Sequence, residues 1–271
     1  MVPVSVIRDD DRLNELEGTR EDATARRLDS VADLREKGCR TLALDVTDEA
    51  SMRAAVAEVE QAEGAVGALV NNAGYSQSGA VESVGPEELR AQFETNVFGL
   101  IRMTQLVLPG MRRQHWGRIV NVGAMGGRLT FPGGGVYHAT KYAVEAISDA
   151  LRFEVKGFGV DVALIEPGLI KTEFAAAAVR AMDSGTVEEG PYAEFNRAVA
   201  ASTVGAYQGA LARLGGGPET VARAIEKAIT SRRPRARYPV TPSARLIMGQ
   251  RAVLGDRLWD SFMGTRFPRP E

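Results

Sequence analysis

Short apolar runs alternate with longer segments of helical spacing from about residue 40 onward, and this alternation limits the folds open to the chain. The apolar runs are TLALDV, VGALVNNAG, GRIVNVGA and VDVALIEPG. The segments between them are SMRAAVAEVEQAEG, PEELRAQFETNVFGLIRMTQLVLPGMRRQ and VYHATKYAVEAISDALRFEV. Short buried strands that alternate with helices are typical of a parallel sheet with helices on both faces. The sequence therefore predicts an α/β, doubly wound (Rossmann-like) fold.

The pattern loosens after Pro167, but no second domain is indicated. The segment 172–217 is alanine-rich and mostly helical, and 241–271 forms a helical tail. Residues 1–22 fit the alternation poorly, because MVPVSVI is one strand candidate and an acidic, turn-rich stretch follows it. We expect a single Rossmann-like domain over 1–271, with 1–22 as an atypical N-terminal arm.

Composition and charge argue against several classes of partner. The chain of 271 residues is 44% hydrophobic and carries a formal net charge of −2. Nucleic acids and acidic membranes attract strongly positive proteins, so neither is expected as a partner. No apolar stretch approaches the ~20 residues that cross a bilayer, and no secretory signal is evident. We expect a cytoplasmic protein with no membrane span and no metal site.

Tyr137 and Lys141 form a Y-x-x-x-K pair, and residues four apart share one face of a helix. Taken alone, the pair could equally be an exposed helix surface. It follows the stretch FPGGG and the apolar run GRIVNV, however, and NNAG ends the apolar run before that. Together these motifs resemble those of the short-chain dehydrogenase/reductase family over about residues 23–172. The resemblance implies an oxidoreductase that interconverts an alcohol and a carbonyl with a nicotinamide cofactor.

The resemblance implies catalytic roles for three residues. The family tyrosine is the general acid or base, and a free phenol has a pKa near ~10. Lys141 would favour the phenolate of Tyr137 by its charge and would also hydrogen-bond the nicotinamide ribose. Asn96, in FETNVFG, matches the asparagine that holds a proton-relay water. A helix-capping or helix-interrupting asparagine is the alternative interpretation of Asn96.

The resemblance also implies where the cofactor lies. Asp45 and Val46, in ALDVTD, match the pair that brackets the adenine. Asn72 and Gly74, in NNAG, match the segment against which a ribose of the cofactor rests. PGLIKT matches the family motif P-G-x-x-x-T, and the residues expected to flank the nicotinamide are Pro167, Gly168, Ile170 and Thr172.

An arginine pair bears on the choice between the two nicotinamide cofactors. ATARRLD resembles the end of the second strand, where the family places an arginine against the 2′-phosphate of NADP. Arg26 or Arg27 would then favour NADP over NAD, because guanidinium donors match phosphate oxygens. A solvated arginine pair is the alternative, and NAD stays open as the cofactor.

Two departures from the family pattern put activity in question. The family serine lies thirteen residues before the tyrosine and donates a hydrogen bond to the substrate oxygen, but position 124 is alanine. Loss of one such donor costs about 10²–10³ in rate. The glycine-rich turn T-G-x-x-x-G-x-G is also absent before ATARR, although the backbone must approach the pyrophosphate there. We expect weakened dinucleotide binding and a first strand that is truncated, mis-framed or rearranged.

The substrate side of the chain carries less information. The substrate-covering segment 172–217 is apolar with few charges, which favours a small lipophilic carbonyl or alcohol. Plain helix packing is the alternative interpretation of this segment. The tail through Trp259 and Phe262 resembles that of hydroxysteroid and retinol dehydrogenase-like members of the family.

Two functions remain open at this point. The first is an NADP-dependent oxidoreductase, and the second is a catalytically impaired or inactive relative that serves binding or assembly. A serine hydrolase is poorly supported, because GYSQS lacks the closing glycine of a nucleophile elbow. The family pairs through its two long helices, which implies a homodimer or homotetramer.

Overall fold

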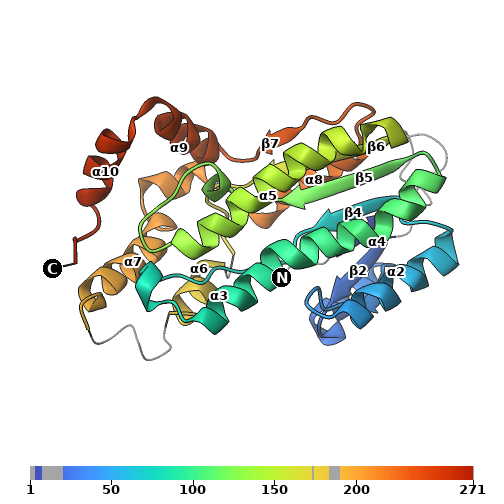
Figure 1. Ribbon diagram of the computed structural model, residues 1–271, viewed down its shortest axis with the longest axis horizontal. Coiled ribbons are helices and arrows are strands. Elements are labelled where there is room, and N and C mark those ends of the chain that lie inside the picture. Colours follow the sequence, from blue (N-terminus) through green and yellow to red (C-terminus); the bar gives the residue numbers. More distant parts are fainter. Residues whose placement is uncertain (1–3, 8–20, 173, 183–189, 271) are drawn as a thin grey trace.

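The computed structural model is a seven-stranded sheet with helices on both faces (Figure 1). It describes residues 4–7, 21–172, 174–182 and 190–270. The strand order is β3-β2-β1-β4-β5-β6-β7. The strands are β1 Val4–Ile7, β2 Glu21–Ala25, β3 Arg40–Ala43, β4 Ala68–Asn71, β5 Gly117–Val122, β6 Val160–Glu166 and β7 Arg237–Pro239. The prediction of an α/β, doubly wound fold is confirmed.

Ten α-helices are seen in the described residues. They are α1 Ala32–Glu36, α2 Glu49–Glu63, α3 Pro86–Phe93, α4 Gly99–Arg113, α5 Gly135–Glu154, α6 Phe174–Arg180, α7 Ala193–Ala206, α8 Pro218–Thr230, α9 Pro242–Val253 and α10 Asp256–Gly264. Local chemistry sets several of their starts. Asp48 caps α2 by accepting a hydrogen bond from the Ala50 N–H at 2.9 Å. Proline stands in the first turn of α3, α8 and α9, where no amide donor is needed.

Two apolar layers hold the sheet between its helices. Residues of α2 and α4 pack with the sheet on one face, around Leu69, Val107 and Ile119. Residues of α8 pack on the other face, around Val70 and Ile165. The strands β4, β5 and β6 are buried along most of their length, which explains their continuous apolar runs.

β1 departs from the predicted parallel sheet. It runs antiparallel to both neighbours, with Val4 opposite Thr24 of β2 and Ile7 opposite Ala68 of β4, whereas the other described pairs are parallel. A parallel strand–helix–strand unit takes about 30 residues, but Val4 to Ala25 span only 22. The short first strand is therefore present inside the sheet, between β2 and β4, and it runs in the reverse direction. The acidic stretch that follows it, 8–20, lies outside the described residues.

The sequence predicts a helix from residue 86 that Pro109 and Gly110 break near its far end. The prediction of a break is wrong, because α4 continues through Pro109 to Arg113. Pro109 and Gln105 are both exposed, so water can satisfy the Gln105 carbonyl that loses its amide partner.

Helices after β6 contribute to a further apolar cluster, apart from the sheet layers and from the small cluster of Leu100, Val144 and Leu164. Side chains of α7, α9 and α10 pack around Leu129, with Val199, Ile247 and Trp259 among them. Within the described residues, no helix is both long enough and apolar enough to span a bilayer.

Candidate active site

Tyr137 and Lys141 lie near the start of α5 and on the same side of it. The Lys141 Nζ lies 5.9 Å from the centroid of the Tyr137 ring. It also donates a hydrogen bond to the main-chain oxygen of Val122, at the end of β5, at 2.8 Å. The Tyr137 ring packs against Phe174 of α6, with 5.6 Å between centroids. The structure therefore brings the predicted pair together at the carboxyl end of the sheet.

Asn96 lies in a π-helical turn, Glu94–Phe98, that joins α3 to α4. Its Nδ2 donates to the Tyr75 main-chain oxygen at 2.9 Å and to Thr140 Oγ1 at 3.0 Å, and its Oδ1 accepts from the Tyr75 N–H at 3.1 Å. Thr140 Oγ1 in turn donates to the main-chain oxygen of Tyr137 at 2.7 Å. Asn96 thus interrupts the helix and links the loop after β4 to α5. Turns of this kind are frequent at functional sites.

Gly74 permits a close approach beside these two polar groups. A Cβ atom at position 74 would lie 3.0 Å from the Asn96 Oδ1 and 3.8 Å from the Lys141 Nζ. A side chain at this position would therefore occupy the space next to the ammonium.

Burial controls the protonation of the pair. It raises the pKa of the Tyr137 phenol well above its ordinary value, and the nearby Tyr207 phenol raises it further. Burial lowers the pKa of Lys141 to about 8. We expected the ammonium to favour the phenolate, but loss of water around the phenol has the larger effect here. The neutral phenol is consequently the stable form of Tyr137, and it can act as a proton donor.

Ala124 follows β5 and precedes the short turn Met125–Gly127. Its φ and ψ angles of −169° and 163° are extended, so the backbone also suits a serine. Its methyl group cannot donate a hydrogen bond. The next amide, that of Met125, donates to the Pro167 main-chain oxygen at 2.8 Å, which ties this turn to the loop after β6.

A cavity of about 130 Å³ lies at the carboxyl ends of β2, β3 and β4. Four predicted cofactor residues line it, namely Arg26, Asp45, Val46 and Gly74, and they are joined by Tyr75 and Thr95. Arg27 is not among the lining residues. Although burial opposes it, hydrogen bonds from Thr47 and the charge of Arg26 lower the pKa of Asp45.

The predicted nicotinamide segment follows β6 and is held mostly by α9. A Cβ atom on Gly168 would lie 2.3 Å from Thr241 Oγ1, so the backbone packs tightly on the start of that helix. Ile170 forms a bridge with Gly216, and Thr172 Oγ1 accepts from the Phe174 N–H at 3.2 Å. Pro167 contacts the turn that follows Ala124, because its main-chain oxygen accepts from the Met125 N–H. Asn72 lies in the same loop as Gly74 but does not line the 130 Å³ cavity.

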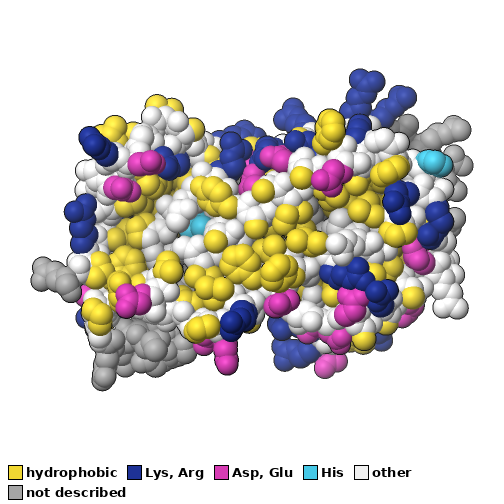
Figure 2. Space-filling view, in the orientation of Figure 1, with side chains coloured by type: hydrophobic (Ala, Val, Ile, Leu, Met, Phe, Trp, Pro, Cys, Tyr) yellow, Lys and Arg dark blue, Asp and Glu magenta, His cyan; other side chains and the backbone are white. Residues whose placement is uncertain are grey.

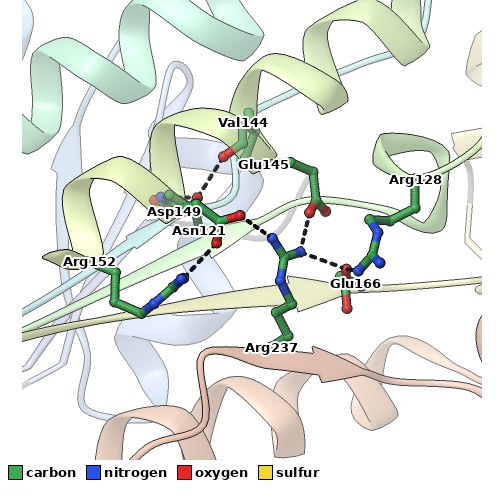
Figure 3. Close-up of polar contacts among 9 residues, drawn as sticks. Asn121, Arg128, Val144, Glu145, Asp149, Arg152, Glu166 and Arg237 are labelled. Carbon is green, nitrogen blue, oxygen red and sulfur yellow. Dashed lines mark hydrogen bonds and ion pairs between the residues drawn. The ribbon is translucent and has the colours of Figure 1, made fainter.

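An ion cluster lies further along α5, on the turns that follow Lys141 (Figure 3). Arg237 of β7 pairs with Glu145 and Asp149 of α5 and with Glu166 at the end of β6. Arg128 also contacts Glu166, at 3.4 Å. Burial raises the pKa of Glu145 despite its hydrogen bond from Arg237. The cluster ties the helix that carries the Tyr137 pair to the edge of the sheet.

Sequence reasoning did not find three residues of this site. Tyr207 lies one residue beyond α7, seventy positions from Tyr137, and its sequence context carries no motif. Thr140 and Tyr75 lie inside recognised motifs or directly after them, but their roles depend on contacts with Asn96. The only sequence signal for Thr140 was its spacing of three residues from Tyr137, which places the two residues next to each other on a helix.

The residues present fit part of a nicotinamide dinucleotide. Arg26, Asp45 and Val46, which were predicted for the adenosine end, line one cavity. Gly74 and Lys141, which were predicted for the nicotinamide ribose, lie next to each other. The described residues contain no glycine-rich turn for the pyrophosphate, since β1 ends at Ile7 and the next described residue is Glu21.

Comparison with known proteins identifies the family. The model of the short chain dehydrogenase family matches residues 17–183. The chain belongs to the short-chain dehydrogenase family. An uncharacterized oxidoreductase of Bacillus subtilis, YusZ, is 32% identical over 250 residues, which cover 89% of this chain and 87% of the relative. An NADPH-dependent 3-dehydrocapnine reductase of Ornithobacterium rhinotracheale is 34% identical over 232 residues, 81% of this chain and 77% of the relative.

Solved structures agree with this assignment. A short-chain dehydrogenase from Streptomyces avermitilis superposes with a TM-score of 0.73 at 32% identity, over 89% of this chain and 84% of the other. A family member from Burkholderia phymatum in complex with NAD has a TM-score of 0.67 at 25% identity, over 90% of this chain and 83% of the other. The protein is thus an oxidoreductase of the short-chain dehydrogenase type, a family whose members use nicotinamide cofactors.

Proposed function

We propose that this protein is an NADP-dependent reductase that converts a carbonyl to an alcohol on a small, lipophilic substrate. The observation that carries the proposal is the buried, neutral phenol of Tyr137 with the Lys141 ammonium on the same side of α5. A neutral phenol can donate the proton that carbonyl reduction requires, and the phenolate that it leaves is the base for the reverse reaction.

The chemistry divides between cofactor and protein. Bound NADPH supplies the hydride for the carbonyl carbon. The Tyr137 hydroxyl donates its proton to the carbonyl oxygen, which leaves a phenolate in the cleft. The Lys141 ammonium stabilises that phenolate by charge, and Asn96 holds the loop and helix that frame it. Ala124 provides no second donor to the substrate oxygen, so we expect a rate below that of a serine-containing site.

Arg26 supports the choice of NADP. It lines the cavity beside Asp45 and is exposed, and it forms no salt bridge with the described residues, so its guanidinium is accessible to a 2′-phosphate. The NADPH-dependent relative points the same way. The relative in complex with NAD makes a direct comparison of the two cofactors necessary.

The lipophilic character of the substrate is supported by α6 and α7. The Phe174 ring stands over Tyr137, and residues 174–182 offer Arg180 as their only charged side chain. We propose that these helices cover the substrate.

We propose further that the protein works as a cytoplasmic homodimer or homotetramer. Hydrophobic side chains gather over α4 and α5 on one face of the molecule (Figure 2). Phe153, with 88% of its surface exposed, stands on α5 with Tyr142, and Phe98 stands at the start of α4. Exposed apolar patches of this kind support association between copies. The free thiol of Cys39 suits a reducing compartment.

A second candidate function is a non-catalytic binding protein on the same scaffold. Ala124 favours it, and so does the lack of a glycine-rich turn among the described residues. Such a protein would bind NADPH weakly or would bind it without turnover.

Titration with NADPH, followed by nicotinamide fluorescence, separates the two functions. We expect saturable binding, and NADPH oxidation with lipophilic ketones that falls by at least about 10²-fold in Tyr137→Phe. Tyr142→Phe is the matched control, because Tyr142 is an exposed tyrosine on the same helix. Absence of NADPH binding at millimolar concentration would leave only the binding protein.

A further inference from the structure

A second cavity, of about 360 Å³, lies along the loop that follows β4. Gly74 and Tyr75 of this loop line the 130 Å³ cavity, whereas Gln77, Ser78 and Gly79 line the second one. One short loop therefore borders both cavities. A volume of this size is within the range of small-molecule sites.

The second cavity is tied to the loop that leads into α5. The Gly79 N–H donates to the Gly133 main-chain oxygen at 2.8 Å, and Gly133 lies four residues before Tyr137. A Cβ atom on Gly133 would lie 2.3 Å from a methyl group of Val199. Val199 and Asn196 are three residues apart on α7, so both face these loops. The cavity wall thus continues toward the catalytic helix.

Asn196 presents an unpartnered donor in this wall. The side chain is completely buried, and its Oδ1 accepts a hydrogen bond from the Ala80 N–H at 2.9 Å. Because the Ala80 amide is a donor, the oxygen of Asn196 must face it and the NH₂ group must point elsewhere. That Nδ2 has no partner among the described residues. A buried donor without a partner costs free energy, so this NH₂ group favours a ligand that offers an acceptor.

The charges and hydroxyls of the wall restrict that ligand. Glu82 and Glu88 line the cavity, and the lining residues include no lysine, arginine or histidine. Ser78 and Ser83 add hydroxyl groups. Carboxylate or phosphate ligands would be repelled by the two glutamates, whereas a hydroxyl oxygen accepts from Asn196 without carrying charge.

We propose that this cavity binds a hydroxyl-bearing, non-anionic end of the substrate, with the hydroxyl oxygen accepting from Asn196 Nδ2. This inference rests on the proposed reductase function, and it narrows the substrate to a carbonyl compound that also carries a hydroxyl. The lipophilic remainder of such a substrate would lie under α6 and α7.

Three probes with one carbon skeleton test the proposal. They are 1,2-propanediol, 1-amino-2-propanol and lactate, which share a 2-hydroxyl and are neutral, cationic and anionic at carbon 1. The side-chain NH₂ signals of Asn196 in a ¹H–¹⁵N spectrum report binding without cofactor or turnover. We expect saturable shifts with the diol and the amino alcohol at millimolar concentrations, and markedly weaker binding of lactate. No shift with the diol, or equal binding of lactate, would overturn the proposal.

Asn196→Asp keeps an oxygen that accepts from the Ala80 N–H and replaces the NH₂ donor by a carboxylate oxygen, which cannot donate to the ligand and which adds a negative charge. We expect diol affinity, measured on backbone signals of Gln77–Gly79, to fall about threefold to tenfold, the range of one neutral hydrogen bond. Unchanged affinity would contradict the assignment. Glu82→Gln keeps an acceptor for the Tyr192 hydroxyl, which now bonds Glu82 at 2.8 Å, and should strengthen lactate binding even if the first variant fails to fold. Lactate binding that Glu82→Gln leaves unchanged would refute the charge argument.

NADPH fluorescence keeps the two proposals separable. If Asn196→Asp binds NADPH normally and still loses the diol, the cavity is assigned regardless of turnover. If the wild-type protein binds the diol but not NADPH, the reductase function fails while the cavity remains a site for hydroxylated ligands.

Discussion

Replacement of Lys141 by methionine tests whether the active site is held at a cost to folding stability. Only 7% of Lys141 is exposed, and its Nζ contacts the Val122 main-chain oxygen rather than a carboxylate. Methionine has a similar length and no charge. The variant therefore removes the titration of this group while it fills nearly the same space.

The magnitude follows from the pKa. Burial lowers the pKa of Lys141 from 10.5 to about 8, and each unit corresponds to ~1.4 kcal/mol, so the shift amounts to roughly 3 kcal/mol. Because the folded pKa lies below the unfolded one, the unfolded chain binds more protons between pH 8 and pH 10.5. The free energy of unfolding of the wild-type protein should therefore rise with pH across this window. Below pH 8 the full free-energy cost of burying the charged Lys141 remains.

Urea unfolding of wild type and Lys141→Met at several pH values measures this effect. We expect wild type to gain roughly 3 kcal/mol relative to the variant between about pH 8 and pH 10.5, whatever their difference at neutral pH. Lys37→Met is the control, since the Lys37 side chain is 69% exposed. The free energy of unfolding of this variant should depend on pH in the same way as that of wild type. A constant difference between wild type and Lys141→Met over the whole range would refute the burial argument.

Three further substitutions test the site. Ala124→Ser should raise turnover of a ketone by about 10²–10³, because serine restores a donor and the extended backbone suits it. Ala124→Cys, a poor donor of similar size, should not raise turnover. Equal turnover in wild type and Ala124→Ser would place the defect in the cofactor pocket. Arg26→Ala should weaken NADP binding about tenfold or more and leave NAD binding unchanged, whereas Arg27→Ala should leave the binding of both cofactors unchanged. An equal loss of NADP binding in both variants would refute the assignment to Arg26. Gly74→Ala should lower the free energy of unfolding by about 1–3 kcal/mol and weaken NADPH binding, because its methyl group would press on the buried amide beside it. Gly157→Ala, which meets open space, should be neutral in urea unfolding, and similar losses in both glycine variants would point to backbone effects instead.

Much of the fold and the catalytic pair could be predicted because their signals are local in the sequence. Apolar runs of four to seven residues became β4, β5 and β6, since strands buried on both faces need continuous apolar side chains. The spacing of Tyr137 and Lys141 placed both side chains on one side of α5, because four residues make about one helical turn. The NNAG and ALDV segments end strands, which brought Gly74 and Asp45 to one cavity.

Tertiary structure alone decided the direction of β1, the charge state of the site and the second cavity. Pairing between Val6 and Leu69 joins segments more than sixty residues apart, and no local pattern encodes its direction. Exclusion of water by α6 and the end of α7 sets the pKa of Tyr137 above its usual range, although the sequence places an ammonium nearby. Asn196 acquires its role only where α7 meets the loop after β4. These properties depend on which distant segments displace solvent, and a one-dimensional pattern does not contain that information.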